Sequence, residues 1–483
     1  MTRGAVTLDA GQRECFLNYR AGKNLGVFGS AGCGKSVLLR AVIGHATTRY
    51  GPAAVGVCSW NGSAADLIGG VTLHSLFSCG IFLGTPESFL RALLSRTRAT
   101  EKLRRLRILI VDEVFTITSG ALAVFLRALR GIRPVELQAL PAGGLQVVCT
   151  CLHICIVCVV VAPRRMCPFL QRGACLGHIL TSCASCSPIS CFTELLTVAG
   201  DPLQTRPVEL SPSPTGSLLF QCLQWRSLFR GGRGAIHALS GSHRCSGDTA
   251  FGAMLERMRL GFHNQEDIDT INKTWDQFSD EQRVRMPQLR ALCDSVSKYN
   301  VQQLQQLVGS VSVSNAIDEL MVSPEKKADV AARLSRVAPN QVCFKVGAPI
   351  IATRRLSPSV PTGTMGVVVR LSADGVECLF KNQRVLPVPV HWEVFDQAGR
   401  VEGRRLQLPI ILAWAVTIHR AQGSEMECVC IDFSLDRAWA CDGLVYAAVS
   451  RVRSFGSLCV RGLTLAHVRT NPSCLAFWMS MVE

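Results

Sequence analysis

Residues 29–36 read Gly-Ser-Ala-Gly-Cys-Gly-Lys-Ser, which matches the phosphate-binding pattern G-x-x-x-x-G-K-S. The apolar run 25–28 precedes this stretch and the helix-forming run 37–43 follows it, so the local order is strand, loop and helix. Glycines let the backbone curl until its N–H groups point at phosphate oxygens. A lysine and a hydroxyl at the end of the pattern suit phosphate and Mg²⁺. The predicted nucleotide-binding residues are Gly29, Ser30, Ala31, Gly32, Cys33, Gly34, Lys35 and Ser36, with Ser36 also offered to Mg²⁺.

Further short apolar runs extend the predicted sheet. Residues 55–58, 107–111 and 195–199 alternate with helical stretches, which is typical of a parallel sheet covered by helices on both faces. Parallel strands end at one edge of a sheet, so polar residues that follow them should face the phosphate loop. The sequence therefore predicts a nucleotide site along this edge.

Three polar residues at that edge are candidates for catalysis. Asp112 and Glu113 directly follow the run 107–111, and Gln204 follows the run 195–199. We expect Asp112 to hold Mg²⁺, directly or through water, and Glu113 to polarise the attacking water. The Gln204 amide could touch the γ-phosphate or its water and report hydrolysis to a second domain.

The composition fits a globular protein with an anionic partner. Apolar residues make up 48% of 483 positions, which excludes a disordered chain. Lys and Arg total 51 against 35 Asp and Glu, a formal net charge of +16 that favours nucleic acid and, more weakly, a membrane surface. Residues 1–4 carry no apolar signal segment, so we expect no secretion and no need for paired cysteines.

Residues 149–191 differ from the rest of the chain. They hold nine of the 23 cysteines, and no Asp, Glu or Lys lies between Thr150 and Thr193. The flanking stretches 144–148 and 197–201 look like the two halves of one strand. An insertion there would break the hydrogen-bond ladder on both neighbours, which favours translated intron sequence over a functional domain.

Three other interpretations of this segment stay open: a genuine insertion, a membrane helix and a zinc module. The apolar run 147–162 is shorter than the roughly 20 residues that a membrane helix needs. Zinc requires four ligands with polar support around them, and the segment is poor in such support. The candidate zinc ligands are His153, Cys155, Cys158, His178, Cys183 and Cys186.

The length suggests about three domains, or two with large insertions. We expect a first domain over residues 1–210, a linker over 211–216 and a second domain over 217–483. Residues 253–340 are mostly polar and helical, and 341–400 carry Val-rich runs with Gly and Pro turns that suit a β-rich module.

Several segments, in order, carry a family resemblance. Gly-Ser-Ala-Gly-Cys-Gly-Lys-Ser, the strand ending in Asp112-Glu113, and Gly-Asp-Pro-Leu-Gln204 resemble motifs I, II and III of superfamily-one helicases. The other matching segments are Leu8-x-x-x-Gln12, 61–65 with 69–75, Ser242-His243-Arg244 with 251–261, 408–423, and 446–453. The chain is similar to the Pif family of 5′-to-3′ DNA helicases, relatives of bacterial RecD, from about residue 7 to 463, excluding 149–191.

The resemblance implies an α/β fold of two RecA-like P-loop domains with parallel sheets and ATP in the cleft between them. It also implies that Gln12 reads adenine and that Arg244 and Arg451 reach the γ-phosphate from the second domain, beside Lys35, Glu113 and Gln204. The residues implied to contact single-stranded DNA are Thr72, His74, Thr417, His419 and Gln422.

The implied function is ATP- and Mg²⁺-dependent 5′-to-3′ translocation on single-stranded DNA with unwinding of duplex, in DNA repair, recombination, telomere or organellar DNA maintenance. We expect single-stranded and forked DNA as partners, no stable membrane association and a monomer. The expected location is the nucleus, with the mitochondrion as the alternative. A RecD-type or RNA-directed helicase, or a nucleotide-binding pseudo-enzyme if 149–191 is genuine, remain the alternative functions.

Overall fold

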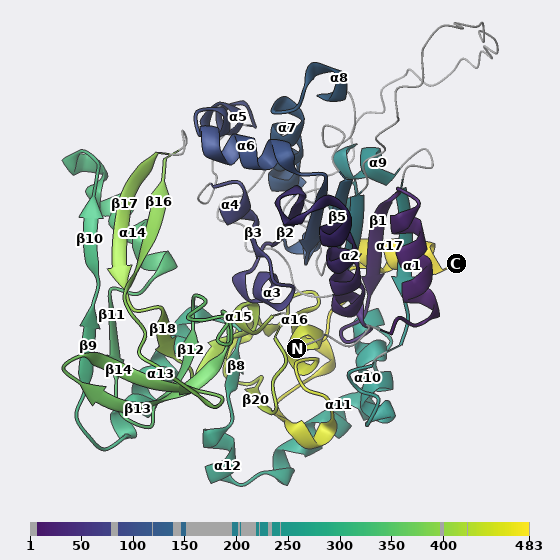
Figure 1. Ribbon diagram of the computed structural model, residues 1–483. Coiled ribbons are helices and arrows are strands. Elements are labelled where there is room, and N and C mark those ends of the chain that lie inside the picture. The colour runs from purple at the N-terminus through teal and green to yellow at the C-terminus, as the bar shows by residue number, and fades with distance from the viewer. Residues whose placement is uncertain are drawn as a thin grey trace, which may run out of the picture.

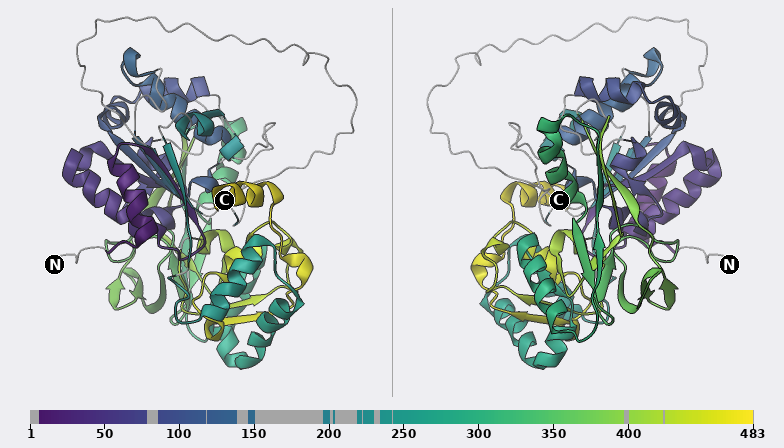
Figure 2. Two further views of the ribbon diagram at one scale, coloured as in Figure 1. Left: turned by 90° about the vertical axis from the view of Figure 1, so that its right-hand side faces the viewer. Right: turned by 90° about the vertical axis from the view of Figure 1, so that its left-hand side faces the viewer.

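The computed structural model describes most of the chain. The described residues are 7–78, 86–117, 119–138, 146–150, 196–200, 203, 219–221, 223–229, 234–241, 243–396, 400–422 and 424–482. They form two α/β lobes and a β-rich module (Figures 1 and 2). No helix among them is long and apolar enough to cross a membrane. Residues 151–191, on which the zinc and membrane interpretations depend, lie outside the described residues.

The first lobe is built on a parallel sheet. Within the described residues it has seven strands in the order β3-β2-β4-β5-β6-β1-β7. Strands β1 and β4 are buried along their whole length, which explains their continuous apolar sequences. The predicted runs 25–28, 55–58, 107–111 and 195–199 are confirmed as strands of this sheet. The strands are β1 (Asn24–Gly29), β2 (Val55–Ser59), β3 (Val71–Thr72), β4 (Ile108–Asp112), β5 (Gln146–Thr150), β6 (Leu196–Gly200) and β7 (Gly234–Leu239).

Helices cover both faces of this sheet (Figure 1). The Asp9 side chain caps the first helix by accepting from the backbone N–H of Gln12, and the phosphate loop leads directly into the second. The helices are α1 (Ala10–Arg20), α2 (Lys35–Tyr50), α3 (Gly62–Leu67), α4 (Leu73–Leu76), α5 (Pro86–Leu94), α6 (Thr97–Arg105), α7 (Ser119–Gly131), α8 (Val135–Gln138) and α9 (Leu223–Phe229).

The predicted domain boundary at 210–217 is wrong, because a strand and a helix that come after it in the sequence belong to the first lobe. Strand β7 pairs in parallel with β1 from Asn24↔Gly234 to Gly29↔Leu239. The last helix, α17 (Pro472–Val482), also packs on this lobe: Phe477 stacks on Phe220 with ring centroids 4.1 Å apart. The predicted linker 211–216 lies outside the described residues.

The second lobe has a smaller parallel sheet, in the order β19-β8-β20-β21 within the described residues. Its strands are β8 (Gln288–Arg290), β19 (Ala415–Thr417), β20 (Val429–Asp432) and β21 (Leu458–Arg461). Its helices are α10 (Thr249–Leu260), α11 (Gln265–Asn272), α12 (Asp280–Arg285), α13 (Cys293–Gln306), α15 (Ile418–Ala421) and α16 (Leu444–Val449).

The β-rich module is larger than the predicted 341–400. Its strands begin at Ser312 and end at Leu412, because flanking polar segments pair with the predicted ones, as in β9 with β11. One helix, α14 (Lys327–Val337), packs on them. The strands are β9 (Ser312–Asn315), β10 (Ile317–Leu320), β11 (Gln341–Phe344), β12 (Pro349–Ala352), β13 (Met365–Ser372), β14 (Gly375–Phe380), β15 (Gln383–Val385), β16 (Val390–Phe395), β17 (Val401–Gln407) and β18 (Ile410–Leu412).

The flanks of the cysteine-rich segment form two strands rather than one interrupted strand. Strands β5 and β6 run parallel to each other, and both pair with β4. The start of β4 pairs with β5 at Ile108↔Gln146, and its end pairs with β6 at Val111↔Val198. The two flanks thus share one edge of β4.

Candidate active site at the phosphate loop

The phosphate loop begins at the end of β1, where Gly29 pairs with Leu239 at the end of β7. A Cβ atom at Gly29 would lie 2.4 Å from the Cys33 sulfur and 2.6 Å from the Leu239 carbonyl oxygen, so no side chain fits there. Gly34 has a φ of 87° and begins helix α2 from the left-handed region, which favours glycine. These two glycines give the loop its predicted curl.

Lys35 and Ser36 occupy the first turn of α2. The Lys35 ammonium donates to the carbonyl oxygens of Gly29 at 2.8 Å and Ser30 at 2.7 Å, so it lies over the loop. Ser36 is half-buried beside it. A helix N-terminus adds its own positive potential at this place. The charge and the hydroxyl therefore lie where a loop-bound phosphate would meet them.

Two carboxylates lie at the end of β4, at the same edge of the sheet. Asp112 is 7% exposed, and its Oδ1 accepts from the Glu113 backbone N–H at 2.9 Å. Glu113 has φ 57° and ψ 41°, a left-handed conformation that costs a side-chain-bearing residue about 1–3 kcal/mol. Such strain persists at functional sites, where the surrounding structure enforces it. It makes Glu113 a candidate general base on geometric grounds.

Two arginines of the second lobe meet at the end of α16. Arg244 Nη1 donates to the Ser450 carbonyl at 2.8 Å and its Nε lies 3.5 Å from Glu425. Arg451 is 3% exposed and donates from Nε to the Ala447 carbonyl at 2.7 Å. Both predicted arginines are thus held close together by main-chain carbonyls.

The buried arginine also interacts electrostatically with the first lobe. Burial lowers the pKa of Arg451 to about 10, the Arg244 charge acts in the same direction, and the Glu113 carboxylate opposes both. Arg451 therefore stays protonated at neutral pH. The catalytic carboxylate candidate of one lobe and both arginines of the other belong to one cluster of charges.

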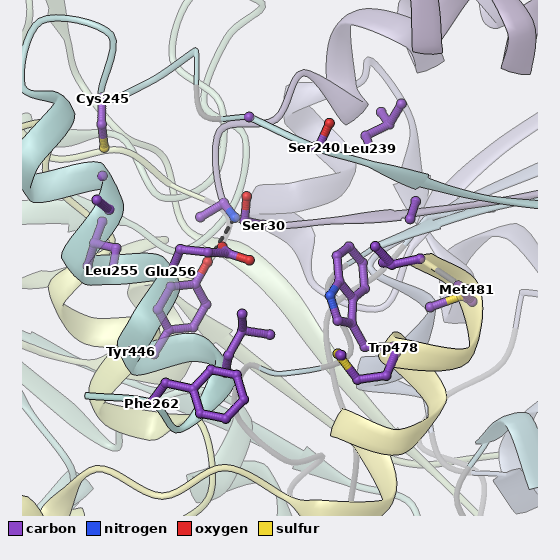
Figure 3. Close-up of a pocket in the computed structure, with 18 of the residues that line it drawn as sticks. Ser30, Leu239, Ser240, Cys245, Leu255, Glu256, Phe262, Tyr446, Trp478 and Met481 are labelled. Atoms are coloured by element: carbon purple, nitrogen blue, oxygen red, sulfur yellow. Dashed lines mark hydrogen bonds between the residues drawn. The ribbon is translucent and has the colours of Figure 1, made fainter. Parts of the chain in front are cut away.

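Hydrogen bonds join the two lobes at the loop itself. The Ala31 backbone N–H donates to the Tyr446 hydroxyl at 2.9 Å (Figure 3). The His243 N–H donates to the Gly32 carbonyl at 3.0 Å. The sequence analysis did not single out Tyr446. It is the first residue of the segment 446–453 that carries the family resemblance, but no role was predicted for it.

Gln12 lies against the loop but is held by its neighbours. It is 3% exposed, its Nε2 donates to the Gly34 carbonyl at 3.3 Å, and its Oε1 accepts from the Asp9 N–H at 3.0 Å. Reading adenine through this amide would require one of these bonds to exchange. Gln204, the remaining predicted catalytic residue, lies outside the described residues.

The predicted DNA-contacting residues fall into two groups. Thr417 and His419 line a pocket of 330 Å³ between α3, α15 and the β-rich module, together with Ser63 and Trp392. Among the described residues that line this pocket, none is acidic, which suits a nucleic acid. The residues predicted around position 417 therefore lie on a polar surface between α3, α15 and the β-rich module.

The other three residues are held by contacts within the protein. Thr72 caps α4 by accepting from the Ser75 N–H at 3.2 Å. His74 packs against Trp60 with ring centroids 4.5 Å apart, and burial lowers its pKa to about 4, so it is neutral. Gln422 is 2% exposed and takes part through its main-chain carbonyl, which accepts from the Ser63 hydroxyl at 3.3 Å.

Asp66, next to this pocket, was not predicted from the sequence, although it joins two parts of the molecule; we call its contacts the Asp66 clamp. Asp66 on α3 pairs with Arg355 and accepts from the Thr362 N–H at 2.6 Å, which ties the first lobe to the β-rich module. The partners are 289 and 296 positions apart, so no local pattern could have revealed them.

The comparisons with known proteins agree with this architecture. A family model described as PIF1-like helicase matches residues 8–171. ATP-dependent DNA helicase PIF1 of Xenopus laevis is 27% identical over 490 residues, covering 99% of this chain and 65% of the relative. The human protein of the same name is 27% identical over 470 residues, covering 95% of this chain and 62% of the relative.

Over residues 8–171 the chain matches the model of the PIF1-like helicases, and it is similar to PIF1 helicases along most of its length. It spans less than two thirds of the length of these two curated relatives. The crystal structure of Pif1 helicase from Candida albicans superposes with a TM-score of 0.77 at 22% identity, covering 99% of this chain and 100% of that chain.

A second Pif1 structure supports the same fold. The Bacteroides helicase in complex with ADP-AlF3 and single-stranded DNA superposes with a TM-score of 0.69 at 18% identity, covering 98% of this chain and 97% of that chain. The predicted α/β fold with two RecA-like domains and a β-rich insertion is confirmed.

Proposed function

We propose that this Pif1-like chain is an ATP-dependent DNA helicase that moves 5′-to-3′ on single-stranded DNA and unwinds duplex. One observation carries the proposal: the second-lobe segments that hold Arg244 and Arg451 contact the phosphate loop of the first lobe. The His243 N–H donates to the Gly32 carbonyl at 3.0 Å, and the Tyr446 hydroxyl accepts from the Ala31 N–H at 2.9 Å. An arginine supplied across a cleft stabilises charge on a transferring phosphoryl group. Relatives whose names include DNA helicase, and one solved with single-stranded DNA, support DNA as the partner.

The oxygen-bearing side chains near the loop fit Mg²⁺ as the ion that is bound together with the nucleotide. Mg²⁺ prefers oxygen ligands and binds through one or two protein groups plus substrate phosphates. The Ser36 hydroxyl and the Asp112 carboxylate are oxygen ligands of this kind. Ser36 lies in the first turn of α2, and Asp112 is the last residue of β4. Bound Mg²⁺ would supply charge neutralisation for the phosphates.

The chain's own groups then explain how hydrolysis could move the lobes. Lys35 and the loop amides bind phosphate, Glu113 accepts a proton from the attacking water, and the arginines sense the phosphate charge from the other lobe. Loss of that charge loosens the arginines and lets the lobes separate. The pocket at Thr417 and the Asp66 clamp would change with each such movement, because both join parts of the two lobes.

DNA-stimulated ATP hydrolysis is the first expected result. We expect single-stranded DNA to raise the turnover of the chain and Lys35→Ala to abolish it, because the ammonium at the loop is lost. Phosphate release measured with and without a poly-dT oligonucleotide tests this. Equal stimulation by single-stranded RNA would favour the RNA-directed alternative, and no stimulation by DNA would refute the proposal.

Strand displacement decides the direction of movement. Partial duplexes with a single 5′ tail should be unwound and those with a single 3′ tail should not. The opposite preference would contradict the proposed polarity. Size-exclusion chromatography with light scattering on the same preparation tests the proposed monomer.

The nucleotide-binding pseudo-enzyme is a second candidate, favoured by the way β5 and β6 share one edge of β4. A parallel sheet has room for one neighbour on each edge of a strand, so the segment between them could disturb the catalytic edge. Activity of the full chain compared with a chain lacking 149–191 separates the candidates. A message read across this segment shows whether it is translated intron sequence.

The cellular role is part of the proposal. We propose a nuclear enzyme of DNA repair, recombination or telomere maintenance, with mitochondrial DNA maintenance as the alternative. The name of the relatives and the basic charge of +16 support a role on DNA. Microscopy of the tagged protein tests the location.

A further inference from the structure

Tyr446 reaches from the second lobe to the phosphate loop. Its hydroxyl accepts the Ala31 N–H at 2.9 Å, and the residue is 2% exposed. In Figure 3 the ring rises from its helix and points its hydroxyl at the loop beside Ser30. A buried contact of this kind excludes water, so it transmits displacement from one partner to the other.

The helix that carries Tyr446 also holds both arginines. Every residue of α16, Leu444–Val449, is buried, so the helix behaves as one rigid unit. The Ser450 N–H donates to the Tyr446 carbonyl at 3.0 Å, and the Ser450 carbonyl accepts from Arg244 at 2.8 Å. One turn of helix thus links the loop contact to Arg244, and the Ala447 carbonyl holds Arg451 at 2.7 Å.

We propose that Tyr446 is a positioning residue that fixes the two arginines in place relative to the phosphate loop. This inference rests on the proposed ATPase function and adds to it a route between the lobes. A loop that shifts when it takes up phosphate would pull α16 with it through the hydroxyl. The arginines would then arrive at the phosphate together with the helix.

The ring has room to follow such a shift. Tyr446 lines a cavity of 880 Å³ bounded by β7, α10 and α17. Movement toward open space avoids the overpacking that fixes most core side chains. The backbone bond from His243 to Gly32 does not involve the ring, so the loop keeps one anchor if the hydroxyl is removed.

The substitution Tyr446→Phe tests the proposal in the full chain. It removes the hydroxyl and keeps the ring contacts. The control is Tyr19→Phe, which also removes one buried hydroxyl bond, to His45 Nδ1 at 3.0 Å, from a residue 3% exposed in the first lobe. Two readouts are needed: the kinetics of DNA-stimulated ATP hydrolysis and the hydrogen exchange of the loop amides without DNA or nucleotide.

We expect Tyr446→Phe to lower kcat about tenfold and to leave KM for ATP within about twofold, because lost arginine positioning affects the transition state. Exchange of the peptide covering 30–34 should become about tenfold faster. Tyr19→Phe should change neither. Wild-type kcat or wild-type loop exchange in Tyr446→Phe would overturn the proposal.

The same experiment separates this inference from the proposed function. A wild-type chain whose ATPase does not respond to DNA would refute the function. The exchange measurement needs no turnover, so it would still decide whether Tyr446 holds the loop.

Discussion

Glu113→Gln is expected to lower the ATP turnover of the chain by about 10²–10⁴-fold while nucleotide still binds. The change keeps the size and planar shape of the side chain but replaces one carboxylate oxygen by an NH2 donor, so the side chain can no longer accept a proton. The backbone of Glu113 is strained at φ 57°, and the preceding residue, Asp112, is buried. The surrounding structure therefore determines the conformation of Glu113. Single-turnover hydrolysis and fluorescent-ADP binding, measured in parallel, check both halves of the expectation.

An exposed glutamate provides the matched control for that variant. Glu101 lies on the solvent face of α6 and its substitution by Gln removes the same charge. We expect turnover of Glu101→Gln within about twofold of wild type, since exposed charges contribute little. Near-normal turnover in Glu113→Gln would show that Glu113 is not the general base and that another residue has this role.

Arg451→Lys is expected to lower kcat by about 10³-fold or more, in the range reported for removing an arginine that stabilises a phosphoryl-transfer transition state. Lysine keeps a positive charge but loses the planar fork of donors. Arg451 is buried, and its pKa of about 10 reflects the cost of that burial. A charge kept in such a place despite its cost points to a role in function rather than stability.

The neighbouring Arg453 tests whether the effect is local. Its side chain is 68% exposed and pairs with Glu425, so Arg453→Lys should leave kcat within about twofold of wild type. Thermal unfolding of both variants checks that neither loses its fold. Equal kcat for Arg451→Lys and wild type would show that the buried arginine does not reach the reaction.

Much of the first lobe could be predicted because its signals are local. Strands β1 and β4 are buried along their length, so their sequences are apolar without interruption. The loop pattern 29–36 requires glycine at fixed positions, and the structure shows the steric reason at Gly29. Asp112 and Glu113 follow from their place at the end of a buried strand.

The module boundaries were harder to predict because polar strands leave a weak pattern. Strands β9 and β10 are mostly exposed and carry few apolar residues, so the segment read as helical and polar. Their assignment depends on pairing with β11 and β17, whose residues lie far along the chain. Exposed strands are determined by their partners more than by their own composition.

The sequence by itself determined the nucleotide-binding loop, the parallel strands around it and the order of the segments that resemble a helicase. These depend on residues within a few positions of one another, where backbone geometry and apolar burial act directly. The tertiary structure alone decided that β7 and α17 complete the first lobe, and that Tyr446 bonds to the loop 415 positions away. Such contacts form only when separate lobes pack together, so they cannot be predicted from the spacing of residues along the sequence.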